Sequence, residues 1–255
     1  MRPLAPINEI GALTKLFSAR KTQKIIPNLL KAILFDFDGT LAELNIDFLR
    51  MRAAVLNLMS DYCTPRDEMK DLYVLEMIEA GRNFISINNP GMENEFFNGA
   101  HELISHMETE RSKEGKLFAG TENMLHELRN RHIKTGIVTR NCTAAVRQMF
   151  PDVDSHCDTV ITREFTARVK PHPDHLLTAL DVLDTDAKFA AMVGDHPMDI
   201  TMGKEIGAYT IGVLTGYSGA IPLRKAGADL IIEKAADITR LIPEGFKGPR
   251  IRGFE

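Results

Sequence analysis

Short apolar runs alternate with longer stretches of helical periodicity along most of this 255-residue chain. The runs are rich in β-favouring residues and indicate buried strands, at 32–35, 134–139, 158–162, 188–193, 208–213 and 229–232. Between most of them apolar residues recur at helical spacing, at 122–131, 143–150, 173–183, 198–206 and 235–241. This alternation predicts an α/β fold, a doubly wound parallel sheet with helices on both faces. Ligands of such sheets bind at the carboxyl ends of the strands.

Residues 45–116 follow a different pattern, with helical spacing and almost no strand signal. Turn residues at Thr64-Pro65 and at 88–91 divide the segment, and helices are expected at 48–59, 66–83 and 94–113. We therefore predict an inserted all-helical domain at 45–116. The α/β core is then formed by residues 30–44 together with 117–255.

The first 29 residues form a basic N-terminal extension, in which Glu9 is the one acidic residue among five basic ones. They contain no continuous apolar stretch of the kind that a secretory signal requires. A basic amphipathic helix at 10–21 is one reading, as a targeting or docking segment. The expectation we favour is an extension that packs on the core.

Composition narrows the class of protein. The chain is 44% hydrophobic and 26% charged, and its net charge of −4 gives no reason to expect nucleic acid as a partner. No apolar run approaches the roughly 18 residues of a membrane span. Its three cysteines are widely spaced and contain no Cys-x-x-Cys pair, which is typical of free thiols in a cytoplasmic protein. We expect a monomer or a homodimer that does not bind membranes.

Polar side chains follow the predicted strands where each one ends. The first strand runs directly into Asp36 and Asp38, two carboxylates that are costly to bury together without a cation. Other predicted strands end in, or are followed by, the Thr139 hydroxyl and two further acids, Asp195 and Asp199. Lys170 lies just before a predicted helix. If the strands are parallel, these groups meet at one edge of the sheet.

Converging carboxylates need positive charge, which Lys170 and a hard divalent metal can supply. Mg²⁺ suits such a site because it binds a few carboxylate oxygens while keeping water and a substrate phosphate. A metal, a lysine, a hydroxyl and a carboxylate nucleophile are the components of phosphoryl transfer. The residues therefore indicate a Mg²⁺-dependent enzyme that acts on a phosphate group.

The same residues resemble the haloacid dehalogenase-like (HAD) hydrolases. Asp36-Phe37-Asp38-Gly39-Thr40 matches the first motif of that family, DxDxT, at every specified position. The other three motifs follow in the family's order, as Thr139, Lys170 and Gly194-Asp195-x-x-x-Asp199. The resemblance covers about residues 30–243 and implies a Rossmann-like core, with the helical insertion as a cap of the phosphoglycolate phosphatase type.

The resemblance implies roles for the individual residues. Asp36 would be the nucleophile that becomes phosphorylated, and Asp38 the general acid and base. Mg²⁺ would be held by the Asp36 carboxylate, the Asp38 backbone carbonyl and Asp195, with Asp199 either joining or orienting that set. Thr139 and Lys170 would contact the phosphoryl oxygens, and further phosphate or substrate contacts are expected from Gly39, Thr40, Arg140 and Asn141.

Two of these residues have alternative readings from sequence. Arg140 could pair with a second anionic group of the substrate or point to solvent, and Asp199 could simply cap the helix that follows it. Retention of Asp38 favours hydrolysis of a phosphate ester of a small metabolite. The alternatives are a phosphomutase of the same family and a non-catalytic binding or regulatory protein on this scaffold.

Overall fold

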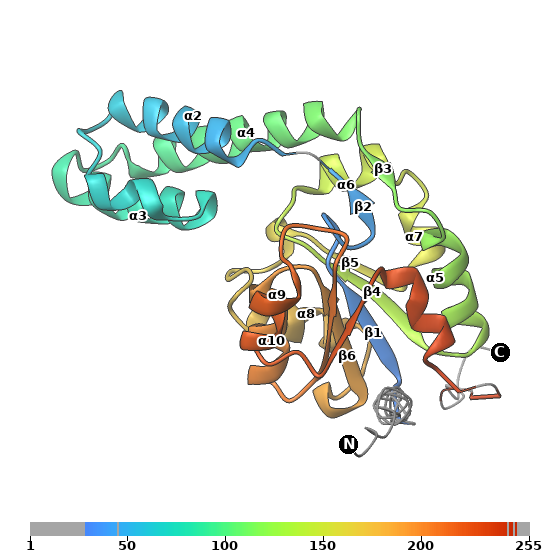
Figure 1. Cartoon of the computed structure of the whole chain (residues 1–255). Helices are drawn as coiled ribbons and strands as arrows, with labels where there is room; N and C mark the ends of the chain where they lie inside the picture. The colour runs from blue at the N-terminus through green and yellow to red at the C-terminus, as the bar shows by residue number, and fades with distance from the viewer. Residues whose placement is uncertain (1–28, 45, 244, 247, 249–255) are drawn as a thin grey trace, which may run out of the picture.

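A six-stranded parallel sheet forms the centre of the computed structural model, which describes residues 29–44, 46–243, 245, 246 and 248 (Figure 1). The order of its strands is β5-β4-β1-β6-β7-β8. Their bounds are Ala32–Phe35 for β1, Lys134–Val138 for β4, Thr159–Ile161 for β5, Ala190–Gly194 for β6, Tyr209–Val213 for β7 and Leu230–Ile232 for β8. All six strands predicted from the apolar runs are present. The chain builds outward from β1 in both directions, so the predicted doubly wound sheet is confirmed.

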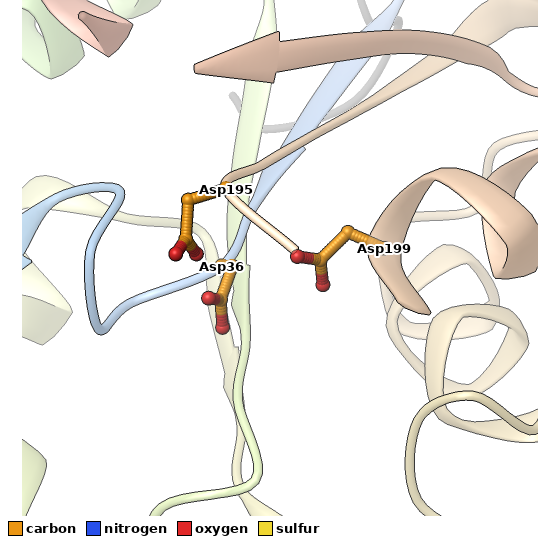
Figure 2. Close-up of side chains that lie close together, drawn as sticks. All are labelled: Asp36, Asp195 and Asp199. Carbon is orange, nitrogen blue, oxygen red and sulfur yellow. The ribbon is translucent and has the colours of Figure 1, made fainter. Parts of the chain in front are cut away.

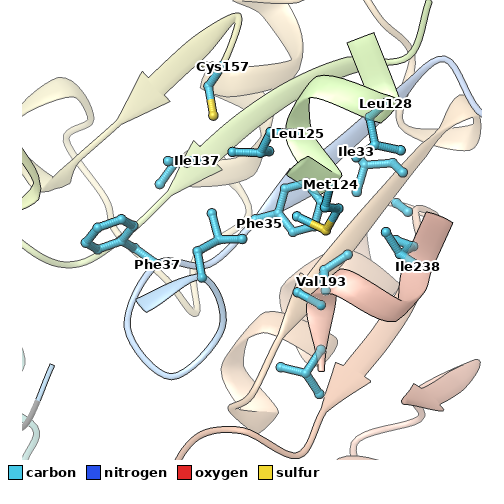
Figure 3. Close-up of a cluster of buried hydrophobic side chains, with 14 of the residues drawn as sticks. Ile33, Phe35, Phe37, Met124, Leu125, Leu128, Ile137, Cys157, Val193 and Ile238 are labelled. Atoms are coloured by element: carbon cyan, nitrogen blue, oxygen red, sulfur yellow. The ribbon is translucent and has the colours of Figure 1, made fainter. Parts of the chain in front are cut away.

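Strand β1 is buried on both faces, which explains why its sequence is continuously apolar. Successive side chains of a strand point to opposite faces, and Ile33 and Phe35 accordingly lie in one apolar cluster while Ala32 and Leu34 lie in another. Figure 3 shows the first cluster, where Phe35 packs among side chains of α5 (Thr121–Asn130). The two clusters hold one layer of helices on each face of the sheet.

Helices cover both faces. The cluster around Phe35 receives side chains from α5, α6 (Thr143–Met149) and the 3-10 helix η4 (Ala235–Arg240). The cluster around Leu34 receives them from α8 (Asp174–Val182) and α9 (Pro197–Glu205). Sequence periodicity predicted these five helices, but 235–241 is a 3-10 helix rather than an α-helix. The short elements α7 (Val153–His156), η2 (Arg163–Phe165), η3 (Ala187–Phe189) and α10 (Ala220–Lys225) were not predicted.

Between β1 and β4 the chain forms a helical unit beyond the carboxyl end of β1 (Figure 1). It contains α2 (Phe48–Ser60), η1 (Asp67–Asp71), α3 (Val74–Asn88) and α4 (Glu93–Ser112). These helices bury an apolar cluster of their own, in which Phe96 is fully buried. The chain leaves and re-enters the core through two short antiparallel strands, β2 (Ala42–Glu43) and β3 (Lys116–Leu117). The last turns of α4 pack on α6 of the core.

The expectation of one helix at 66–83 was wrong. Leu72 and Tyr73 have extended backbone conformations, so η1 ends at Asp71 and α3 begins at Val74. Neither glycine nor proline marks this break in the sequence. The ring of Tyr73 lies 6.0 Å from the ring of His196, which belongs to the core. A contact between the helical unit and the core therefore accompanies a break that local sequence does not encode.

Two further expectations concern features outside the site. The three cysteines are free thiols, as predicted. Among the helices that the structure describes, none combines the length and the apolar character needed to cross a bilayer. Apart from Leu29, the N-terminal extension lies outside the described residues, so neither its expected packing on the core nor a helix at 10–21 is tested.

The helical unit depends on its own apolar cluster, and this can be tested by substitution. Phe96→Ala should lower the free energy of unfolding by about 3–5 kcal/mol, because it removes a fully buried ring and leaves a cavity. Ile87→Ala is the control, since this side chain on α3 is 78% exposed and should change the free energy by less than about 0.5 kcal/mol. Urea denaturation measures both values. Equal effects of the two substitutions would contradict the packing described above.

Candidate active site

The three acids Asp36, Asp195 and Asp199 meet at the carboxyl edge of the sheet (Figure 2). Asp36 follows β1 and Asp195 follows β6, and these neighbouring parallel strands are in register, with Phe35 opposite Val193. The Asp36 backbone N–H donates to the carbonyl of Val193 at 2.8 Å, which continues the ladder by one residue. One carboxylate oxygen of each acid lies within 4.8 Å of the others. Parallel pairing thus produces the predicted convergence of residues that are far apart in the sequence.

Lys170 supplies the positive charge that buried carboxylates require. Its Nζ lies 2.5 Å from Asp36 Oδ1 and 2.8 Å from Asp199 Oδ1, and the residue is only 3% exposed. Burial alone would lower the pKa of Lys170, but the carboxylates of Asp199 and Asp36 outweigh that effect and raise it. Lys170 is therefore a fixed cation in this site.

One lysine does not balance three acids, and the pKa values of two of the acids are raised. Burial and the neighbouring carboxylates of Asp36 and Asp199 raise the pKa of Asp195 to about 7. Burial also raises the pKa of Asp199 to about 6, although Lys170 acts against it. All the donors are hard carboxylate oxygens, the kind that Mg²⁺ prefers over softer metals. The cluster therefore matches a hard divalent cation in both charge and donor type.

Asp199 has two partners, and one of them matches the sequence reading that it caps the following helix. Its Oδ1 pairs with Lys170, while its Oδ2 accepts from the backbone N–H of His196 at 3.2 Å in a capping box at the start of α9. The His196 ring nitrogen Nδ1 accepts in turn from the Met198 N–H. The cap fixes the carboxylate that orients Lys170.

Asp195 lies against glycine backbone that has no room for a side chain. A Cβ built on Gly39 would lie 2.6 Å from Asp195 Oδ2, and a Cβ on Gly216 would lie 2.1 Å from the same oxygen. Gly39 also has a φ of +78°, which favours glycine. The Tyr217 N–H donates to this oxygen at 2.6 Å, and the Thr40 hydroxyl lies 3.5 Å from Oδ1. Gly39 and Thr40 thus contact the acid cluster.

Gly216 and Tyr217 were missed by sequence reasoning. They follow the end of β7, so the strand-end rule that identified Asp36 and Asp195 could have found them. The nearby Thr215 hydroxyl donates to the Gly39 carbonyl at 2.6 Å, which ties the two glycine segments together.

Asp38 has a different environment from Asp36. Its Oδ2 accepts from the Asn141 side-chain amide at 3.0 Å, and its buried Oδ1 has no hydrogen-bond partner among the residues that the structure describes. Burial, followed by the charges of Asp36 and Glu108, raises the pKa of Asp38 well above its ordinary value. A carboxyl group that keeps its proton at higher pH is suited to act as a general acid.

The turn after β4 brings Thr139, Arg140 and Asn141 to the same edge. The buried Thr139 hydroxyl oxygen accepts from the Asn141 N–H at 3.1 Å, and its proton remains to be donated. Arg140 makes two bonds to the Glu76 carboxylate of α3, at 2.8 and 2.6 Å, and also donates to the Lys170 carbonyl. Arg140 is thus paired with the helical unit rather than directed to solvent.

The imidazole ring of His175 holds the backbone of Lys170 in place. Its Nδ1 accepts from the Lys170 backbone N–H at 3.2 Å, and its Nε2 lies 3.2 Å from the Ile161 carbonyl. Burial, aided by the charge of Lys170, lowers the pKa of His175 to about 3. The neutral ring therefore acts as a spacer between β5 and the lysine segment.

A buried ion pair between Glu108 and Arg163 was also missed. The two side chains are 7% and 3% exposed, and their closest atoms are 2.6 Å apart. A sequence signal exists for Glu108, because it continues the buried stripe of Phe96, Ala100 and Ile104 on α4 at intervals of four residues. A glutamate on an apolar helical stripe indicates a buried partner.

Comparison with known proteins agrees with these observations. Residues 33–213 match the family described as haloacid dehalogenase-like hydrolase. A Clostridium perfringens protein provisionally named pyrophosphatase PpaX is 32% identical over 219 residues, which cover 84% of this chain and 98% of the relative. Pyrophosphatase PpaX of Bacillus cereus is 27% identical over 224 residues, with 84% and 97% covered.

Two solved structures show the same fold. A predicted phosphoglycolate phosphatase from Haemophilus somnus has a TM-score of 0.59 at 18% identity, over 84% of this chain and 98% of the other. CbbY from Rhodobacter sphaeroides in complex with phosphate has a TM-score of 0.57 at 21% identity, over 82% and 96%. At these identities the structural similarity establishes the fold alone.

The raised pKa values of the acid cluster predict how stability depends on pH and Mg²⁺. In the metal-free protein, Asp195 and Asp199 ionise near pH 7 and 6, whereas unfolded carboxyls ionise near about 4. Stability from these groups is present below the unfolded pKa and is lost as the pH rises through 6–7. Mg²⁺ requires the ionised acids. We expect the increase in Tm caused by Mg²⁺ to be at least about 2 °C larger at about pH 8 than at about pH 5.5.

Scanning calorimetry with Mg²⁺ or EDTA measures this difference. Asp195→Asn is the test variant and should lose most of the pH-dependent response. Asp181→Asn, at an exposed position on α8, is the control and should retain it. An increase in Tm that is the same at both pH values would show that the cluster does not hold the cation.

Proposed function

The chain belongs to the haloacid dehalogenase-like hydrolases and is a phosphatase of that family, and we propose that it hydrolyses a small phosphorylated metabolite through an aspartyl-phosphate on Asp36. The observation that carries this proposal is the buried ion pair between Asp36 and Lys170, with the Asp195 carboxylate close to that of Asp36. Asp38 stands two residues after the nucleophile, in an environment that favours its protonated form. Together these groups supply a nucleophile, a fixed cation and a proton donor.

Asp36 attacks the phosphorus atom of the substrate. As the bond between its carboxylate oxygen and phosphorus forms, the bond between phosphorus and the leaving oxygen breaks. Asp38 gives its proton to that leaving oxygen. Lys170 holds the Asp36 carboxylate in place and offsets the charge on the phosphoryl oxygens, to which the Thr139 hydroxyl also donates.

A water molecule then attacks the acyl-phosphate. Asp38, now a carboxylate, takes a proton from this water as the new oxygen–phosphorus bond forms. The bond between Asp36 and phosphorus breaks, inorganic phosphate leaves, and both aspartates return to their starting states. One carboxyl group thus serves as acid in the first step and as base in the second.

Mg²⁺ would be held by the carboxylates of Asp36 and Asp195 and by the Asp38 backbone carbonyl, where it would neutralise charge on the phosphoryl oxygens. Asp199 would support this set through Lys170, since both of its oxygens have protein partners. The backbone at Gly39 and Thr40 would line the same site. Burial, and after it the neighbouring carboxylates, raise the pKa of Asp195 and of Asp199, and a bound cation would offset both effects.

The helical unit favours a small substrate. Tyr73 and Glu76 contact His196 and Arg140 of the core, so the unit lies against the loops that carry the site. A cap in that position limits the space beside Asp36 and excludes bulk water, other than the water that hydrolyses the acyl-phosphate. Because the two relatives reported above carry the name pyrophosphatase, pyrophosphate is the first substrate to test. Arg140 could bind its second phosphate by exchanging the Glu76 carboxylate for a phosphate, with Asn141 beside it.

The nucleophile assignment predicts the behaviour of Asp36→Asn. This variant should lose Mg²⁺-dependent release of phosphate by about 10³-fold or more, because an amide oxygen cannot form the acyl-phosphate. Activity is measured on pyrophosphate, 4-nitrophenyl phosphate and a panel of metabolite phosphates. Mass spectrometry of acid-quenched wild-type protein should detect one added phosphoryl group, which the variant lacks.

Asp181→Asn serves as the matched control and should keep wild-type activity. Retained activity in Asp36→Asn would show that another group attacks phosphorus. Formation of an isomeric sugar phosphate without release of phosphate would identify a phosphomutase instead. A wild-type protein that turns over none of these compounds would support a binding role.

A further inference from the structure

The Glu108–Arg163 ion pair lies against the turn that carries Thr139, Arg140 and Asn141. Arg163 Nη1 contacts both carboxylate oxygens of Glu108, at 2.8 and 2.6 Å, and its Nη2 donates to the Ser105 hydroxyl at 2.7 Å. Both charged groups are almost completely buried. A buried pair of this kind is costly to desolvate and is strongly disruptive to break. Its partners in the turn therefore show what it holds.

The pair binds the turn backbone on both sides of Asn141. Arg163 Nη1 donates to the Arg140 carbonyl at 3.0 Å, and the Cys142 N–H donates to Glu108 Oε2 at 3.1 Å. The peptide groups before and after Asn141 are thus fixed by two buried charges. The position of the Asn141 side chain follows from theirs.

The Asn141 amide can face Asp38 in one way only. The Cys142 N–H donates to Asn141 Oδ1 at 2.8 Å, and since a backbone N–H can only donate, the amide oxygen must face it. The other end of the amide, Nδ2, therefore faces Asp38, where it donates to Oδ2 at 3.0 Å. The turn thus presents a donor, and not an acceptor, to the carboxyl group.

This contact distinguishes the two oxygens of Asp38. Oδ2 accepts from the Asn141 amide, so Oδ1 is the oxygen left free to exchange a proton with the substrate. Oδ1 is the buried oxygen without a partner among the described residues.

We propose that Glu108 and Arg163 are positioning residues that, through Asn141, orient the Asp38 carboxyl group so that Oδ1 delivers its proton to the leaving oxygen. The proton moves from Oδ1 as the bond between phosphorus and the leaving oxygen breaks and the bond to Asp36 forms. This inference rests on the proposed phosphatase reaction. It adds a function for three residues that do not attack phosphorus.

The same contacts connect Asp38 to the helical unit. Glu108 and Ser105 belong to α4, whose earlier residues Phe96 and Ala100 lie in the cluster of that unit. Helix α4 runs from there to α6 of the core, as Figure 1 shows. The helix that carries the cap therefore also carries the carboxylate that fixes the turn beside the proton donor.

The test compares two substrates that differ in their need for a proton. The leaving group of an alkyl phosphate is a basic alkoxide, which must be protonated as it departs. The leaving group of 4-nitrophenyl phosphate, 4-nitrophenolate, departs without a proton. Glu108→Gln removes the negative charge of the pair and replaces one acceptor oxygen with an NH₂ group, which cannot accept from Arg163 or Cys142. Asn141→Leu removes the donor to Asp38 at similar volume. We expect kcat/KM for the alkyl phosphate to fall about 10²-fold in each variant, and for 4-nitrophenyl phosphate less than about 5-fold.

The parameter kcat/KM is used because it reports the steps up to formation of the phosphoenzyme. Glu110→Gln is the matched control on α4, where an exposed pair with Lys113 should be dispensable for both substrates. If Glu108→Gln does not fold, the double variant Glu108→Leu/Arg163→Met removes both buried charges together and should show the same selective loss.

Equal losses on the two substrates, or no loss, would overturn the proposal, because a merely structural defect does not depend on the leaving group. Thermal unfolding confirms that each variant is folded. A wild-type protein inactive on both of these substrates, on pyrophosphate and on the metabolite panel would instead refute the phosphatase reaction itself. The two failures are therefore distinguishable.

Discussion

The ion pairs of the buried Lys170 with Asp36 and Asp199 are the interactions on which the rest of the site depends. A carboxylate at the end of a buried strand would lose its hydration without compensation. Lys170 prevents this by placing a cation 2.5 Å from Asp36. The neutral ring of His175 and the capped carboxylate of Asp199 both serve to hold that lysine. Two supporting groups that look unrelated in the sequence thus have one purpose.

The other two acids, Asp195 and Asp38, form hydrogen bonds with groups other than Lys170. Asp195 is buried against glycine backbone and accepts from the Tyr217 N–H. Asp38 is held by a neutral amide and keeps one unpartnered oxygen. Two aspartates in a five-residue motif therefore differ in chemistry because one contacts an ammonium group and the other an amide. The proposed roles of nucleophile and proton donor require a difference of this kind.

The helical unit is attached to the core by two ion pairs of unequal character. Arg140–Glu76 is partly exposed, at 20% and 36%, and pairs of that kind contribute little to stability. Glu108–Arg163 is buried, and removal of either partner would leave an uncompensated charge. The attachment of α3 to the loops of the site is therefore weaker than that of α4 to the turn beside Asp38. The α3 end of the unit can therefore separate from the core at lower cost than the α4 end.

The sequence by itself determined the sheet, the insertion and the residues at the strand ends, because these follow from local periodicity. Continuous apolar runs such as Ala32–Phe35 identify strands buried on both faces, and parallel strands bring Asp36 and Asp195 to one edge. Lys170 reaches this edge from the turn before α8. The break at Leu72 and Tyr73 and the partners of Arg140 and Glu108 were decided by the tertiary structure alone. Each depends on a group many residues away, and the sequence near a charged residue does not specify its partner. Periodicity therefore indicated which residues lie at the carboxyl edge of the sheet. Long-range contacts decided which side chains each of them binds.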